Sequence, residues 1–206
     1  MTRFFVLVKM RLLVLGHSVV ARLSQKRNLL RQCNIPSNWE VIFDGRPGAR
    51  IQSFLDVVPN LDPLSHVFFI VVGENDIGYT PFHQIINYMI RLVDYLLSSG
   101  VLCICLGSLL PRFRPLRVSY SQYSRLAREV NRELARVLSF GDNHVFCNFR
   151  GFRRHYLSTD GVHLSPAGER WLLSRILCHV HRAIGQQKNS LCIYSLSGLK
   201  NEFKRL

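Results

Sequence analysis

Short apolar runs alternate along this chain with longer segments of helical periodicity, and this alternation constrains the fold more than any other feature. Five apolar runs are strand candidates, over residues 12–15, 39–43, 67–72, 101–106 and 144–147. In the longer segments between them, apolar residues recur at steps of three and four, which places them on one face of a helix. Strands that alternate with helices form a parallel sheet with helices on both faces. We therefore expect an α/β fold.

The helical segments carry signals at their ends. A helix is expected after each strand, and helices with clear ranges are expected over residues 81–98, 120–138 and 166–183. Ser119 stands directly before the helix over 120–138, and with Gln122 it has the spacing of a capping box, in which two free backbone N–H groups are satisfied reciprocally. In a parallel α/β sheet, ligands bind outside the carboxyl ends of the strands. The residues that follow each apolar run are therefore the candidates for function.

The chain is strongly basic. Its 206 residues include 22 Arg but only 5 Lys, and the formal net charge is +14. Guanidinium groups bind phosphates and carboxylates in a bidentate manner, so contact with a polyanion would use such an excess. A bias in codon usage would produce the same excess without any partner. Both interpretations stay open at this point, and neither bears on the fold.

Composition argues against several classes of protein. With 48% hydrophobic residues the chain is not disordered, and no apolar run reaches the ~20 residues of a transmembrane helix. Lys9 and Arg11 interrupt the apolar N-terminal stretch, which is unlike a secretory signal. The six cysteines form no CxxC pair, so no zinc ribbon is expected, and a reducing compartment is the simpler interpretation. We expect an intracellular protein, cytoplasmic or nuclear.

Polar residues follow several of the expected strands. Ser18 opens a helix after the first strand, Gly48 lies in the turn after the second, and Asn75 follows the third. Near the C-terminal end, His163 comes three residues after Asp160. Each has an ordinary interpretation in isolation, as a helix cap, a turn or a surface loop. At one edge of one sheet, however, they would supply a nucleophile, donors for an oxyanion, and a general base with an orienting carboxylate.

Four motifs resemble the sequence blocks of the SGNH hydrolase superfamily, also called GDSL-like esterases. They are LGHSVV at 15–20, the glycine of RPGARI at position 48, GEND at 73–76 and DGVHLSPAG at 160–168. The resemblance implies a three-layer α/β/α sandwich with a five-stranded parallel sheet in the flavodoxin-like order 2-1-3-4-5. We expect one domain of this kind over residues 1–185. Clear periodicity is lost after Gly185, so residues 186–206 are expected to be a C-terminal extension of unknown structure. The motifs are also similar to esterase domains encoded within animal transposable elements.

The resemblance assigns roles to the motif residues. Ser18 would be the nucleophile, His163 the base and Asp160 its orienting carboxylate. The oxyanion hole would be formed by the N–H groups of Ser18 and Gly48 and by the side chain of Asn75. No metal or cofactor is implied. Two positions depart from the family pattern. His17 stands where the family has Asp, and Glu74 stands where many members have a smaller or apolar residue, which we interpret as tolerated variation.

The implied activity is hydrolysis of a carboxylic ester, acetyl or short-chain acyl, through an acyl-serine intermediate. The substrate would be a small-molecule, lipid or carbohydrate ester, and no residues remain for a large lid. Arginines on the loop after the fourth strand are candidates for contact with substrate or a polyanion: Arg112, Arg114 and Arg117. Four more arginines are spaced along one face of the next helix: Arg125, Arg128, Arg132 and Arg136. This face is either a solvated surface or a binding surface. The alternative function is therefore a basic nucleic-acid-binding module with weak or no catalysis.

Overall fold

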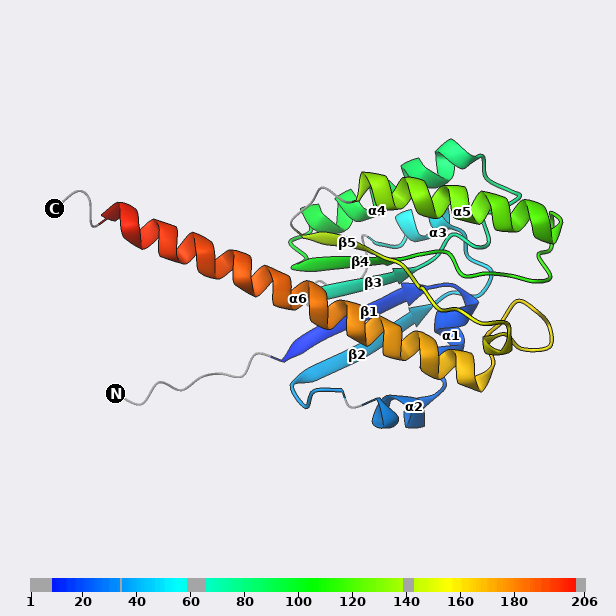
Figure 1. The fold of residues 1–206 in the computed structure, drawn as a ribbon, viewed down its shortest axis with the longest axis horizontal. Coiled ribbons are helices and arrows are strands. Elements are labelled where there is room, and N and C mark those ends of the chain that lie inside the picture. Colours follow the sequence, from blue (N-terminus) through cyan, green and yellow to red (C-terminus); the bar gives the residue numbers. More distant parts are fainter. Residues whose placement is uncertain (1–8, 34, 59–65, 139–142, 203–206) are drawn as a thin grey trace.

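The computed structural model describes residues 9–33, 35–58, 66–138 and 143–202, with only the backbone for residues 27 and 186–202. Its centre is a parallel sheet in the order β2-β1-β3-β4-β5 (Figure 1), which confirms the predicted α/β fold and strand order. The strands are β1 (Met10–Gly16), β2 (Trp39–Gly45), β3 (Val67–Val71), β4 (Cys103–Gly107) and β5 (His144–Cys147). Each of the five lies on a predicted apolar run, shifted by at most two residues at an end.

Helices cover both faces of the sheet (Figure 1). One face packs against α3 (Ile51–Leu55), α4 (Phe82–Ser98) and α5 (Tyr120–Val137). The other face packs against α1 (Ser18–Ser24), α2 (Arg27–Gln32) and α6 (Pro166–Glu202). Successive side chains of a strand point to opposite faces, so a sheet covered on both sides needs continuous apolar runs. This explains why β1 contributes Leu13 and Leu15 to one core and Leu12 and Val14 to the other.

The structure contains the helix-capping residues that the sequence predicts. The capping box at the start of α5 is present, with the Gln122 N–H donating to Ser119 Oγ and the Ser119 N–H donating to Gln122 Oε1. Helix α6 is longer than the predicted 166–183, since its backbone stays helical to Glu202 and projects past the sheet (Figure 1). The proposed domain boundary after residue 185 stays a prediction. No helix among the described residues combines the length and apolarity needed to cross a membrane.

Candidate active site

Ser18 and His163 line the same cavity at the carboxyl edge of the sheet. Ser18 is the first residue of α1, directly after β1, and His163 lies in the loop that precedes α6. The cavity, which we call the serine cavity, has a volume of about 470 Å³ and is also lined by Pro47 from the turn after β2. The structure thus brings together two residues that are 145 positions apart in the sequence.

Asp160 holds the imidazole of His163. The Nδ1 atom of His163 lies 2.7 Å from Asp160 Oδ2, and Asp160 Oδ1 accepts the backbone N–H groups of Val162 and His163, both at 2.9 Å. Desolvation raises the pKa of Asp160, but these hydrogen bonds and the neighbouring imidazole outweigh it and hold the pKa well below its usual range. The carboxylate therefore fixes the proton of His163 on Nδ1, and Nε2 is the nitrogen that can take up a proton.

The loop that carries His163 is tied down by its own backbone. Ser158 N–H donates to the carbonyl of His163 at 2.8 Å, and Ser165 N–H donates to the carbonyl of Tyr156 at 2.8 Å. A Cβ on Gly168 would lie 2.0 Å from the same Tyr156 carbonyl oxygen, so only glycine allows α6 to approach so closely. The glycine of the DGVHLSPAG motif thus serves to seat the histidine loop on the start of α6.

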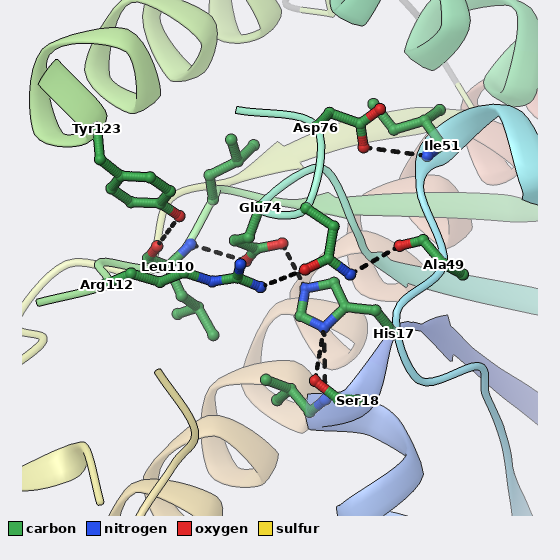
Figure 2. A network of polar contacts seen from close by, with 12 residues as sticks. His17, Ser18, Ala49, Ile51, Glu74, Asp76, Leu110, Arg112 and Tyr123 are labelled. Atoms are coloured by element: carbon green, nitrogen blue, oxygen red, sulfur yellow. Dashed lines mark hydrogen bonds and ion pairs between the residues drawn. The ribbon is translucent and has the colours of Figure 1, made fainter. Parts of the chain in front are cut away.

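His17, next to Ser18, forms a second histidine–carboxylate pair with Glu74. The Nε2 atom of His17 lies 2.7 Å from Glu74 Oε2, and the two residues are only 1% and 2% exposed. On its other side, His17 Nδ1 accepts the N–H of Val19 at 3.4 Å, which caps α1, and lies 3.5 Å from Ser18 Oγ. Figure 2 shows His17 between Glu74 and the start of α1. The ring therefore connects the turn after β3 to the turn that carries Ser18.

Glu74 is ionised in this environment. Burial raises the pKa of its carboxyl, but the imidazole of His17 with its hydrogen bond, the charge of Arg112 and the N–H of Leu110 lower it to about 2. Its Oε1 accepts the Leu110 N–H at 2.9 Å. Because the carboxylate can only accept, His17 Nε2 carries the proton of this hydrogen bond. Interpreting Glu74 as tolerated variation is therefore wrong. His17 and Glu74 pair with each other, and their complementary chemistry was the signal that could have revealed the pair.

Gly48 and Asn75 lie at a second cavity, next to the first. Gly48 has a φ of +76°, a conformation that favours glycine, and the space beside its Cα is open. Asn75 Nδ2 donates to the Ala49 carbonyl at 2.8 Å, and Asn75 Oδ1 accepts from Arg112 at 2.8 Å. The amide still has a second N–H. Since Pro47 lines the serine cavity and Gly48 lines the second one, the two cavities lie on either side of this turn.

Asp76, the last residue of GEND, ties the two turns together. It is 1% exposed, and its carboxylate accepts the Ile51 N–H at 3.1 Å (Figure 2). The carboxylate also accepts the Thr80 hydroxyl at 3.0 Å. Burial raises the pKa of Asp76. Because Ile51 begins α3 directly after the Gly48 turn, this contact links that turn to the turn that carries Asn75. The motif GEND alone did not indicate this role for Asp76.

The three arginines of the loop after β4 have different surroundings. Arg112 is 7% exposed and, like Arg117, lines the second cavity, which has a volume of about 350 Å³. Arg114 lies against Gly161 of the histidine loop instead, where its backbone N–H donates to the Gly161 carbonyl. We call this second cavity the arginine cavity; its lining includes Gly48, Arg50, Asn75, Tyr79, Arg112 and Arg117. On α5, four arginines form an exposed row: Arg125, Arg128, Arg132 and Arg136.

Nothing in the described part of the chain groups three or more His, Cys, Asp or Glu side chains so that they could hold a metal ion. The cysteines whose side chains are described, Cys33, Cys103, Cys105, Cys147 and Cys178, are free.

Sequence comparison finds neither a family model nor a curated protein that matches this chain. Comparison of structures does find similar proteins. A Streptococcus pneumonia protein described as a platelet activating factor has a TM-score of 0.70 at 18% identity, with 85% of this chain and 86% of that chain covered. An aryl esterase from M. smegmatis, solved with an inhibitor, has a TM-score of 0.65 at 18% identity, with coverage of 84% and 99%.

An acetylxylan esterase from Geobacillus stearothermophilus, solved as a catalytic mutant with alanine in place of a serine, has a TM-score of 0.58 at 18% identity, with coverage of 85% and 94%. These similarities show that the chain has the fold of acetyl esterases and acylhydrolases of the SGNH/GDSL type, in agreement with the resemblance of its motifs.

Proposed function

We propose that this chain is an SGNH-type serine esterase that hydrolyses carboxylic esters, with an acetyl or short acyl group, through an acyl-serine intermediate. The observation that carries the proposal is the serine cavity, where Ser18 shares one hollow with His163, whose imidazole is held by an ionised Asp160. The same fold carries esterase activity in neighbours such as the aryl esterase, and in the acetylxylan esterase a serine is the residue changed in a catalytic mutant.

In the first half of the proposed reaction, His163 Nε2 takes the proton of the Ser18 hydroxyl while Oγ attacks the ester carbonyl carbon. The oxyanion that forms is held by the backbone N–H groups of Ser18 and Gly48 and by Asn75 Nδ2. His163 then gives its proton to the alkoxy oxygen, the C–O bond breaks, and the alcohol leaves. In the second half, His163 takes a proton from water, whose oxygen attacks the acyl-serine, and the proton returns to Ser18 as the carboxylic acid departs.

Two histidine–carboxylate pairs flank Ser18, and their different surroundings support different roles for them. His17 is buried, and its Nδ1 already accepts the Val19 N–H, so it has no open path to the oxygen of a leaving alcohol. His163 keeps 25% of its side chain exposed and lies at the cavity. We therefore assign the proton transfers to His163 and the positioning of the serine turn to the His17–Glu74 pair.

Hydrolysis of 4-nitrophenyl acetate by the full chain and by Ser18→Ala tests this function. We expect turnover by the unchanged protein and a loss of about 10³-fold or more in kcat for the variant, whose fold circular dichroism should show to be intact. Equal activity of the two proteins would refute the assignment of Ser18.

A further inference from the structure

The arginine cavity begins where the proposed oxyanion hole ends. Gly48 and Asn75 line it, and three further side chains of the lining are cationic: Arg50, Arg112 and Arg117. An ester whose carbonyl oxygen lies at Gly48 and Asn75 would therefore place one of its substituents next to these guanidinium groups. Charge in this cavity thus bears directly on which esters the site accepts.

The positive charge of the cavity is only partly neutralised. Glu74 is the only carboxylate in the lining, and both of its oxygens are engaged, by His17 on one side and by the Leu110 N–H on the other. Within the residues that the structure describes, none of the three arginines has a carboxylate oxygen within the 4.0 Å of an ion pair. Glu74 and Asp76 lie near enough to Arg112 and Arg50 to interact with their charges, but among the described residues neither carboxylate forms an ion pair with them.

The guanidinium groups are held in place before any ligand arrives. Tyr79 contacts both outer arginines, with Arg117 Cζ 4.4 Å and Arg50 Cζ 5.2 Å from the centre of its ring, and Arg117 Nε donates to the Tyr79 hydroxyl at 2.7 Å. Arg112, buried at the base, donates to Asn75 Oδ1 at 2.8 Å. A guanidinium has five N–H donors, so these contacts leave donors for a ligand. Arginines fixed in this way lose little side-chain entropy when they bind an anion.

We propose that the arginine cavity is a subsite for an anionic group, so that the preferred substrates are esters that carry a carboxylate or a phosphate near the scissile bond. This inference rests on the proposed esterase function and narrows its substrate class. The guanidinium groups would hold the anion by charge-assisted, bidentate hydrogen bonds, which are the strongest that side chains offer. The lining also contains the apolar residues Ile77, Pro115 and Leu116, which would contact the uncharged part of such an ester.

Paired substrates test the subsite. For the acyl side, mono-4-nitrophenyl glutarate is compared with 4-nitrophenyl pentanoate; for the alcohol side, 4-acetoxybenzoate is compared with its methyl ester. The rate with Ser18→Ala is subtracted in every case. We expect a kcat/KM at least about tenfold higher for the anionic member of one pair, as a charge-assisted hydrogen bond provides. A further comparison with 4-acetoxyphenyl phosphate separates a carboxylate preference from a phosphate preference.

In the variant Arg50→Gln/Arg117→Gln, the ratio of kcat/KM for the anionic ester to kcat/KM for its neutral partner should fall to near unity. Arg91→Gln, on the exposed side of α4, removes a charge elsewhere and should leave the preference unchanged. Hydrolysis that depends on Ser18 but shows no anionic preference, or a preference that survives the double change, overturns the subsite and leaves the esterase standing. Absence of any hydrolysis that depends on Ser18 overturns the esterase, and the substrate subsite with it.

Discussion

His17 Nε2 and Glu74 Oε2 lie 2.7 Å apart in a part of the molecule from which water is almost excluded. The pair joins the turn after β1, which carries Ser18, to the turn after β3, which carries Asn75. Glu74 extends the connection to the loop after β4 through the Leu110 N–H. Three loops that contribute to the site are therefore connected through one carboxylate.

The pair should behave as a unit when it is mutated. In His17→Asp, a second carboxylate would face Glu74 and the two charges would repel, whereas His17→Asp/Glu74→Ala removes that repulsion. We therefore expect the double variant to be more stable than His17→Asp alone, although Glu74→Ala alone costs about 2 kcal/mol or more by leaving buried donors unsatisfied. Urea unfolding of the four proteins in a double-mutant cycle measures the coupling. Additive effects would mean that the two side chains do not interact.

Acid should lower the free energy of unfolding by protonating Glu74. Its pKa is lowered to about 2 in the folded state, so the stabilisation it provides is complete above the ordinary pKa of a glutamate and is lost as the pH falls towards 2. The free energy of unfolding of the unchanged protein should therefore decrease over this range more steeply than that of Glu74→Gln. Parallel curves for the two proteins would show that Glu74 has an ordinary pKa in the folded state.

Asp160→Asn tests the orientation of His163. The amide would keep the size of the side chain but no longer hold the Nδ1 proton in place, so we expect kcat to fall by roughly 10²-fold or more while KM changes little. The side chain of Asp160 is 44% exposed, so the free energy of unfolding should change little compared with the fall in kcat. A drop in activity that follows the fraction of unfolded protein would point to a structural role alone.

Gly168→Ala should displace the histidine loop, because its new methyl group would lie 2.0 Å from the Tyr156 carbonyl oxygen. We expect lower stability together with lower kcat. Gly185→Ala is the matched control on the same helix, where a Cβ meets nothing within 4 Å and alanine should stabilise by about 0.5–1 kcal/mol. Thermal unfolding and 4-nitrophenyl acetate hydrolysis measure both effects, and a neutral Gly168→Ala would contradict the close approach.

The sequence predicted the fold well because the strands are buried on both faces and so appear as continuous apolar runs. Because the carboxyl ends of parallel strands share one edge, it also indicated that Ser18 and His163 would lie together, and both residues line one cavity. The His17–Glu74 pair was missed because its members are 57 residues apart and only the sheet order brings them together. The loop after β4 has no periodicity that would separate Arg112, which lines a cavity, from Arg114, which does not.

Labelling by a serine-directed fluorophosphonate detects an activated serine whatever the natural substrate is. We expect stoichiometric labelling at Ser18, found by peptide mass spectrometry, no labelling of Ser18→Ala, and labelling of His163→Ala slowed by about 10³-fold or more. An unlabelled Ser18 in the folded protein, or a rate that His163→Ala leaves unchanged, would contradict this expectation.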